Sequence, residues 1–474
     1  MVPQRGKAAR SAESKAAPRD GRQEGRGVSF TQRQSESKAP AVPARATQGA
    51  KTHAGKWTWV EASVWNERML AALENGVKGG KWFSLIDKVY RPQTLRAAWR
   101  KVAKNAGAAG VDRQSVEQFR AGEEVYLQEL EQALKRGSYK PLAVRRVEIS
   151  KGAGKMRPLG IPAVKDRIVQ TAIKFVIEPI FEREFLEMSY GFRPQLGCKE
   201  ALREVERLLK EGYTHVVDAD ITSYFDSIEW GRLIERISER ISDGRVLELI
   251  EVFLHQDIVQ GLERWTPIGG TLQGAVISPL LANIYLHPLD CQIKQSGYRM
   301  VRYADDFVVL CRSAEQAQAA LAEVKAWAGA NGLSLNAEKT HVGDCRQEGQ
   351  GFEFLGYRFE AGRRWVRRKS LKALRERIRI KTKRTQGDSV ATIIAELNPM
   401  LRGWFNYFKH AHPMTFSGAD GFTRRRLRAI LRKQEKRPGL GKCLDDHKRW
   451  PKAFFADMGL FTMTEAHALA SQSR

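Results

Sequence analysis

Hydrophobic residues recur every three to four positions over much of the chain. This spacing is found between Trp57 and Arg100, across residues 125–136, from Asp166 to about Glu187 and from Ala201 to Leu209. Apolar residues at that period form one face of an amphipathic helix. The pattern therefore predicts helices in these four segments.

Two further segments have the shorter period of β-strands. Residues 215–221 are rich in β-branched side chains, and residues 300–310 contain two apolar runs on either side of Asp305 and Asp306. The second pattern predicts a hairpin with both carboxylates at its tip. Residues 151–158, which include two glycines, are expected to form a loop. Because helices are mixed with single strands and a hairpin, we predict an α+β fold and not a regular βαβ repeat.

Beyond residue 361 the pattern is helical and strongly basic. One apolar stripe predicts an amphipathic helix there and consists of Leu397, Met400, Leu401, Trp404, Phe405 and Phe408. Residues 361–474 carry 27 Lys and Arg beside 9 Asp and Glu, a net charge of +18 out of +26 for the whole chain. Residues 51–360, by contrast, carry 43 basic and 41 acidic side chains. Such an imbalance indicates a polyanionic partner for the C-terminal part.

Composition also indicates the cellular compartment in which the protein is expected. The first 50 residues carry 10 basic and 4 acidic side chains with one aromatic residue, and we expect a disordered basic arm that reaches residue 55. They lack the apolar run of a signal peptide. The longest uncharged stretch, Trp265–Leu289, is broken by proline and glycine, so no membrane association is expected. Five cysteines without a C-x-x-C pair favour a reducing, cytoplasmic location.

Two groups of aspartates are candidates for a divalent metal site. Strand alternation places Asp218 and Asp220 on one face, and the hairpin carries Asp305 and Asp306. Hard cations such as Mg²⁺ prefer carboxylate oxygens, and carboxylates so close together repel one another unless a cation is present. Spacing by itself leaves an alternative, in which Asp218 and Asp226 only end a strand and cap a helix.

The motifs around these aspartates resemble those of reverse transcriptases. Tyr303-Ala-Asp-Asp306 resembles the Y-x-D-D box of that family. The other blocks resemble those of group II intron-encoded proteins, in the same order, and are residues 157–162, 165–170, 189–194, 270–285, 333–340, 354–359 and 397–410. The resemblance covers about residues 80 to 450. It departs at Leu272, where the family commonly has proline, and it lacks the paired cysteines of the H-N-H endonuclease domain found in many relatives. We therefore expect a form without that domain.

The resemblance implies a role for individual residues. Asp220, Asp305 and Asp306 would form the catalytic, metal-binding triad, with two Mg²⁺ ions or with Mn²⁺. Nucleotide-binding residues would be Lys151, Arg157, Tyr224, Gln273 and Lys339. Among them, the Tyr224 ring would lie under the sugar and favour dNTPs, and Lys339 would lie near the pyrophosphate leaving group.

The basic residues of the C-terminal part would contact nucleic acid. The residues expected to bind RNA are Arg367, Arg368, Arg375, Arg379 and Arg402. Those expected to bind DNA are Arg424, Arg425, Arg426 and Arg428. Guanidinium groups suit both sets because they bind phosphate through two parallel hydrogen bonds.

The resemblance also implies an architecture and a function. The fold would be a right-hand polymerase with a basic arm (1–55), an N-terminal helical extension (56–145), fingers and palm (146–360), a thumb or maturase domain X (361–415) and a basic C-terminal segment (416–474). The protein would extend a DNA primer with dNTPs on group II intron RNA and would bind that RNA for splicing and retromobility at a DNA target. Its oligomeric state is left open. Two alternatives remain: an RNA-binding maturase with little polymerase activity, and a reverse transcriptase captured by a host for defence or repair.

Overall fold

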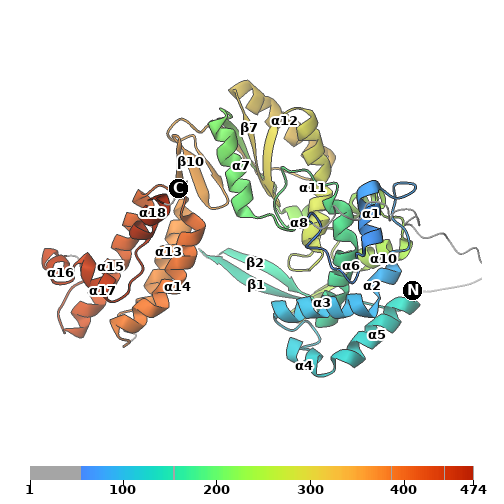
Figure 1. Cartoon of the computed structure of the whole chain (residues 1–474), viewed down its shortest axis with the longest axis horizontal. Helices are drawn as coiled ribbons and strands as arrows, with labels where there is room; N and C mark the ends of the chain where they lie inside the picture. Colours follow the sequence, from blue (N-terminus) through green and yellow to red (C-terminus); the bar gives the residue numbers. More distant parts are fainter. Residues whose placement is uncertain (1–54, 153–154, 386, 442, 473–474) are drawn as a thin grey trace, which may run out of the picture. The chain divides into compact units, whose positions relative to one another are not determined.

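The computed structural model describes residues 55–152, 155–385, 387–441 and 443–472. Within these residues the protein is α+β, as predicted, with three β-sheets and many helices (Figure 1). The predicted basic arm lies outside the described residues except for Gly55.

The N-terminal region is helical but more interrupted than its hydrophobic spacing predicts. Its helices are α1 (Glu67–Asn75), α2 (Ile86–Val89), α3 (Pro92–Asn105), α4 (Val116–Ala121) and α5 (Glu123–Arg136). The helical character predicted for Trp57–Arg100 is confirmed by α1, α2 and the start of α3, with non-helical segments between them. Gly76, the residue after α1, has a positive φ angle that a right-handed helix cannot contain, and Gly79 and Gly80 in the following segment have positive φ angles too. The helix expected over 125–136 is confirmed by α5, which ends at Gly137 in the left-handed conformation.

A long antiparallel hairpin follows and replaces the loop expected over residues 151–158. It consists of β1 (Val144–Gly152) and β2 (Lys155–Ile161), with Ile149 opposite Arg157. Two short strands, β4 (Ile258–Gln260) and β5 (Glu263–Trp265), complete a sheet of order β2-β1-β4-β5. The expectation of a loop is wrong because cross-strand pairing continues as far as Gly152 and Lys155.

Two helices link this hairpin to the central sheet. The first, α6 (Val164–Glu182), packs against α3 and is buried on nearly all sides, including several polar positions such as Asp166 and Gln170. The second, α7 (Cys198–Lys210), buries Ala201, Leu202, Val205 and Leu208. Both helices are confirmed, although α6 ends before the expected Glu187.

The central sheet is antiparallel and has the order β6-β7-β3-β8. Its strands are β3 (His215–Asp220), β6 (Arg299–Tyr303), β7 (Asp306–Cys311) and β8 (His341–Asp344). The helices between them are α8 (Tyr224–Ser227), α9 (Trp230–Ser238), α10 (Gly244–Leu254), α11 (Ser278–Gln295) and α12 (Ala314–Ala330).

Each face of the central sheet belongs to a different hydrophobic core. Val217 and Val309 point into a core formed with α11 and α12. Val216 and Val308 point into a second core formed with α7 and the C-terminal elements. Asp218, Asp220 and Asp306 share the parity of Val216 and Val308, so strand alternation places these carboxylates on the face of the second core.

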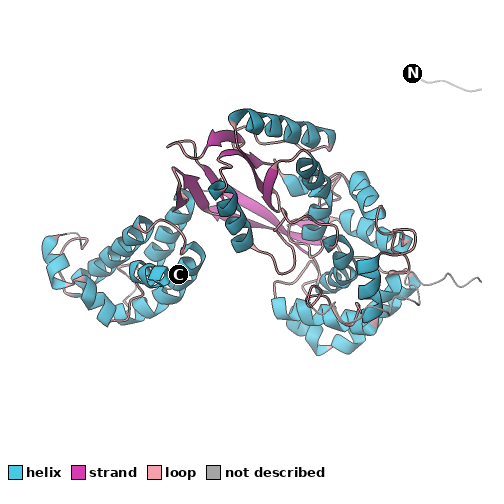
Figure 2. Cartoon of the chain, turned by 45° about the horizontal axis from the view of Figure 1, so that its top comes forward, coloured by secondary structure: helices cyan, strands magenta, loops and turns pink. Residues whose placement is uncertain are grey.

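The C-terminal part begins with a small sheet and continues as helices alone. The sheet contains β9 (Phe352–Phe354), β10 (Tyr357–Glu360) and β11 (Arg363–Val366). The helices, seen without any strand among them in Figure 2, are α13 (Arg368–Lys381), α14 (Val390–Phe408), α15 (Met414–Gln434), α16 (Leu444–Arg449), α17 (Lys452–Asp457) and α18 (Met463–Gln472). The predicted stripe is confirmed: Leu397, Leu401 and Phe405 of α14 are buried in the same core as Phe416 of α15 and Met463 of α18. Residues on both sides of position 415 therefore belong to one packed unit.

None of the helices among the described residues has the length and apolar composition needed to cross a membrane.

Candidate active site

Three of the predicted carboxylates meet at one end of the central sheet. Asp306 is the first residue of β7 and lies opposite Tyr303 of β6, so Ala304 and Asp305 form the turn between these strands. On its other side Asp306 lies opposite Asp220, the last residue of β3. The hairpin predicted from the apolar runs is confirmed, and the sheet register brings Asp220 to it from 85 residues earlier in the sequence.

The carboxylates of this site raise one another's pKa values. Loss of water around the Asp306 carboxyl, together with the charges of Asp218 and Asp305, raises its pKa to about 7, although part of the residue reaches solvent. Burial raises the pKa of Asp218 to about 6. Burial and the charge of Asp220 also raise the pKa of Asp305, while the nearby guanidinium of Arg157 opposes this. A divalent cation would relieve the repulsion that these shifts report.

One lysine neutralises part of this charge. The Nζ of Lys339 donates a hydrogen bond to Oδ2 of Asp220 at 2.6 Å, and the Lys339 segment is tied to the end of β3 because Asn336 N–H donates to the Asp220 carbonyl. Across the described residues, no group of three or more His, Cys, Asp or Glu side chains is arranged to hold a metal ion. The donor chemistry nevertheless fits a hard divalent cation, since the predicted ligands are all carboxylate oxygens. Their negative charge already attracts the ammonium group of Lys339.

The predicted nucleotide-binding residues Arg157 and Gln273 are in direct contact. Arg157 Nε donates to Gln273 Oε1 at 2.7 Å, and Gly160 N–H donates to the Gln273 carbonyl at 2.7 Å. A side chain at Gly274 would collide with the carbonyl of Gly160, 2.3 Å from an ideal Cβ, so glycine permits this close approach. The turn after Leu272 therefore locks onto β2. Lys151 lies in β1, and its side chain is outside the described part of the chain.

Tyr224 does not have the environment expected of a nucleotide contact. Its side chain is 2% exposed, and its hydroxyl donates to the Ala282 carbonyl at 2.5 Å. The expectation that its ring lies under the sugar is therefore wrong for this structure. The short helix α8 turns the residue into the core, which the motif spacing could not reveal.

The arginines expected to bind RNA lie in different surroundings. Arg367 precedes α13 and is close enough to the catalytic carboxylates to lower the pKa of Asp306. Arg368 is exposed at the start of α13. Arg402 is exposed on α14, with its guanidinium 4.6 Å from the centre of the Phe461 ring.

Arginines assigned separately to RNA and to DNA surround one aromatic ring. The guanidinium carbons of Arg375 and Arg379 on α13 lie 5.9 and 5.5 Å from the centre of the Phe422 ring, and that of Arg425 on α15 lies 5.1 Å from it. Burial and the charges of Arg379 and Arg425 lower the pKa of the neighbouring Arg426. We call Arg375, Arg379, Arg425 and Arg426 the Phe422 cluster. Like charges this close attract a polyanion.

Two of the arginines expected to bind DNA have structural contacts. Arg428 is 4% exposed, its Nε donates to the Trp450 carbonyl at 3.0 Å, and its guanidinium packs on Phe455. Its assignment to DNA is therefore wrong, because α15 directs this position toward α16 and α17. Arg426 is half-buried and donates through Nε to Thr382 Oγ1 at 2.9 Å. Arg424 is half-buried on the same helix.

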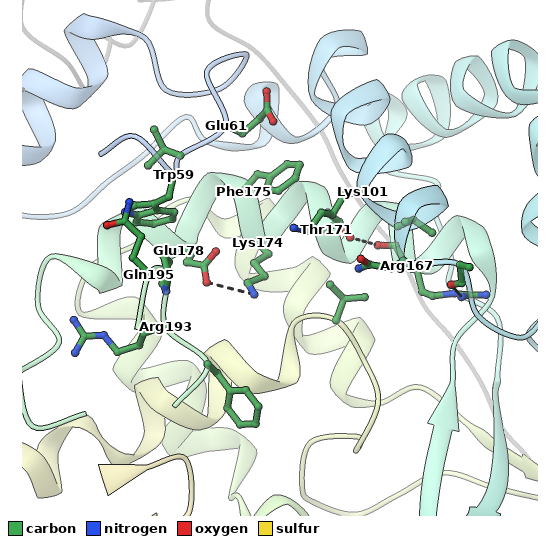
Figure 3. Close-up of a pocket in the computed structure, with 17 residues that line it drawn as sticks. Trp59, Glu61, Lys101, Arg167, Thr171, Lys174, Phe175, Glu178, Arg193 and Gln195 are labelled. Carbon is green, nitrogen blue, oxygen red and sulfur yellow. Dashed lines mark hydrogen bonds and ion pairs between the residues drawn. The ribbon is translucent and has the colours of Figure 1, made fainter. Parts of the chain in front are cut away.

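A cavity of about 430 Å³ lies between the N-terminal region and α6 (Figure 3). Its wall includes the aromatic side chains of Trp59, Phe175 and Phe192. Lys174 and Glu178 of α6 form an ion pair of 3.3 Å within it. None of the catalytic, nucleotide-binding, RNA-binding or DNA-binding residues predicted from sequence is among those lining this cavity. One lining residue, Phe192, has its ring centre 6.4 Å from that of Tyr303, the last residue of β6.

A buried arginine beneath the catalytic turn was missed by the reasoning from sequence. Arg302 immediately precedes the Y-x-D-D box and is 0% exposed. The signal that could have found it is a charged residue between the apolar side chains of Val301 and Tyr303, since a charge buried among apolar neighbours must find a partner.

Comparison with known proteins gives two adjoining family matches. The family described as reverse transcriptase (RNA-dependent DNA polymerase) matches residues 149–359, and the maturase-specific domain of group II introns matches residues 371–450. The first match contains all three predicted catalytic aspartates. The second crosses position 415, in agreement with the shared core of α14, α15 and α18.

Similar proteins cover different shares of the chain. Protein YkfC of Escherichia coli K12 is 36% identical over 321 residues, which are 58% of this chain and 82% of YkfC. The group II intron-encoded protein LtrA of Lactococcus lactis subsp. cremoris is 38% identical over 203 residues, which are 42% of this chain and 33% of LtrA. Among solved structures, a chain of a partial Cas6-RT-Cas1–Cas2 complex is 26% identical, with a TM-score of 0.33 over 54% of this chain and 43% of that one.

Proposed function

The chain belongs to the group II intron family of reverse transcriptases and maturases, and on this premise we propose that it extends a DNA primer with dNTPs on intron RNA by two-metal phosphoryl transfer. The observation that supports this most directly is the register of the central sheet, which sets Asp220 opposite Asp306 beside the Asp305 turn.

The proposed chemistry assigns each polar group a task. Asp220, Asp305 and Asp306 would hold two Mg²⁺ ions, or Mn²⁺, which supply Lewis-acid activation of the primer 3′-hydroxyl and stabilise the charge on the reacting phosphate. Arg157, oriented by Gln273, would bind the triphosphate, where a fixed guanidinium fork suits phosphate oxygens. Lys339 would leave Asp220 for the pyrophosphate when substrate is bound. Lys151 would be a second contact of the triphosphate.

The basic C-terminal part would bind the nucleic acids. Arg367, Arg368 and Arg402 would contact intron RNA, and so would the Phe422 cluster, in which the cations of α13 and α15 are too close to serve separate duplexes. Arg424 would contact the DNA target and the primer. The five cysteines form no disulfide, which supports the proposed cytoplasmic location.

The test is RNA-templated primer extension by single Asp→Asn variants. Asn keeps the size of each side chain but removes the charge needed by a metal ligand, so Asp220→Asn, Asp305→Asn and Asp306→Asn should each abolish extension, a loss of at least ~10³-fold. The matched control is Asp218→Asn on the same face of the same strand, which should keep most activity. Equal loss from all four variants would contradict the assignment of the triad.

A second activity, splicing assistance, is favoured by the maturase-specific match over residues 371–450. An Asp305→Asn protein should still promote splicing of the cognate intron RNA at low Mg²⁺ concentration, because RNA binding does not need the catalytic carboxylate. Failure to stimulate splicing at any protein concentration would argue against this activity.

A further inference from the structure

The arginine beneath the catalytic turn uses its whole guanidinium group. Nε and Nη2 of Arg302 donate to Oδ1 and Oδ2 of Asp290 on α11, at 2.7 and 2.5 Å. Its Nη1 donates both to Oδ1 of Asn283 on the same helix, at 2.9 Å, and to the carbonyl of Ala304, at 3.0 Å. Arg302 and Asp290 are both 0% exposed. The guanidinium therefore connects α11 to the residue that precedes Asp305.

That residue has an unfavourable backbone conformation. Ala304 has a φ of +61°, in the left-handed region that residues with a Cβ atom rarely adopt. Such a conformation persists only where surrounding contacts enforce it. The hydrogen bond from Arg302 to the Ala304 carbonyl is one of these contacts.

The turn is also held from its other side. An ideal Cβ on Gly191 would lie 2.2 Å from the Ala304 backbone nitrogen, so the two backbones touch and only glycine fits. The carbonyl of Gly191 accepts a hydrogen bond of 2.8 Å from Nδ2 of Asn283, the residue whose Oδ1 binds Arg302. Asn283 thus joins the two supports of the turn.

We propose that Arg302, with Asp290 and Asn283, is a positioning residue that fixes the Ala304-Asp305 turn and so sets the Asp305 carboxylate for polymerisation. This inference rests on the proposed function. A buried ion pair is not needed for stability, because well-packed apolar residues of similar size often stabilise a fold equally well or better. Its geometry, with one donor aimed at the strained turn, accounts for a charged pair at this buried position.

The main test replaces the ion pair by apolar residues in an Arg302→Met, Asp290→Leu double variant. We expect a folded protein with an unchanged thermal midpoint and circular dichroism. Its kcat for RNA-templated extension should fall at least ~10-fold, with KM for dNTP changed less than ~3-fold, because an orientation is lost and not an interaction with substrate. Arg302→Lys, which keeps the charge but not the fork, should lose kcat similarly.

A second readout does not depend on catalysis. Hydrogen exchange of the peptide 299–311 should become faster in the double variant, since the turn loses a support, while exchange in α12 stays unchanged. If the double variant fails to fold, Asn283→Leu serves in its place, because it leaves the ion pair intact and removes both links that Asn283 makes.

The control is a second ion pair with one buried carboxylate, away from the turn. Arg432 and Asp446 form an ion pair of 2.7 Å with side chains 14% and 1% exposed, and Arg432→Met, Asp446→Leu should keep kcat on a short primer–template. A double variant at 302 and 290 with normal kcat and normal exchange would overturn the proposal. A wild-type chain without any extension activity would instead refute the proposed function, and the exchange comparison would still decide whether Arg302 fixes the turn.

Discussion

The ammonium of Lys339 lies 2.6 Å from the Asp220 carboxylate, so a positively charged side chain of the protein is paired with one carboxylate of the predicted metal-binding triad. Lys339 is 62% exposed at its side chain and Asp220 41%, and neither is fixed by burial. An exposed pair of this kind is weak and can exchange partners readily. The protein therefore can give up this ion pair when a metal ion and a nucleotide compete for its two halves.

Removing this lysine should have opposite effects on metal binding and on rate. In Lys339→Met, the Asp220 carboxylate loses its competing cation, so half-activation should need several-fold less Mg²⁺. The maximal extension rate should fall about 10-fold, because no ammonium group remains to stabilise the departing pyrophosphate. A Mg²⁺ titration of primer extension measures both, with Lys325→Met on α12 as control. Weaker Mg²⁺ activation would show that the ion pair assists metal binding.

The hydrogen bond between Arg157 and Gln273 should matter for nucleotide affinity. Arg157→Lys keeps the charge but removes the planar fork and the Nε donor, so KM for dNTP should rise ~5- to 10-fold while kcat changes less. Steady-state extension at varied dNTP concentration gives both constants. Arg264→Lys, on β5 of the same sheet, should match the wild type. A pure loss of kcat would place Arg157 in the chemical step and not in substrate binding.

The Phe422 cluster should determine the salt dependence of RNA binding. Arg375→Gln, Arg379→Gln and Arg425→Gln together should weaken binding to intron RNA. They should also make the slope of log affinity against log salt concentration less steep, by ~0.7 to 0.9 for each phosphate that the variant no longer neutralises. Filter binding across a salt series measures the slope. Extension of a short primer–template should change much less.

A control for the Phe422 cluster must leave the hydrophobic core of the C-terminal part intact. Arg136→Gln, on α5, removes a positive charge outside the cluster and should leave the slope unchanged. Deleting everything after residue 415 is not a suitable test, because it would expose Leu401 and Phe405, which pack with Phe416. If the triple variant binds RNA normally but loses affinity for duplex DNA, the cluster is a DNA site.

Stability should depend on pH through Asp166 of α6. Burial raises the pKa of Asp166 to about 6, although it accepts hydrogen bonds from Tyr139 Oη and Leu142 N–H at 2.6 and 3.0 Å. An unfolded aspartate has a pKa of ~3.9. Between these values only the unfolded chain releases its proton, so this group's contribution to stability is complete below about pH 4 and is lost as pH rises through about 6.

The Asp166→Asn variant isolates that effect. It should be less stable than the wild type at pH 4, because one hydrogen bond is absent, and the difference should shift by ~3 kcal/mol in favour of the variant by pH 7. Urea unfolding at several pH values measures the free energies of unfolding. Asp257→Asn should show the opposite trend, since hydrogen bonds from Thr266 and Arg264 lower the pKa of Asp257. A constant difference between wild type and Asp166→Asn would contradict the assignment.

Local patterns predicted those elements whose own residues define them. The stripe from Leu397 to Phe408 indicated α14, and the apolar runs around Asp305 indicated the β6–β7 hairpin, because the period of burial is visible in a short window. The spacing from Trp57 to Arg100 indicated helix but not where it is interrupted, since a few glycines override a periodic pattern. The β1–β2 hairpin was missed because glycine-rich sequence is typical of loops and turns alike.

The candidate site was predictable only in part. Sequence by itself determined the nearly neutral body, the basic C-terminal part, the acidic motifs and, through their order, the family. The tertiary structure decided which groups meet: it set Asp220 opposite Asp306, turned Tyr224 and Arg428 inward, gathered arginines of α13 and α15 around Phe422, and placed Arg302 under Ala304. The reason is physical, since strand register and helix packing depend on contacts between residues far apart in sequence, and a local pattern contains no information about those contacts.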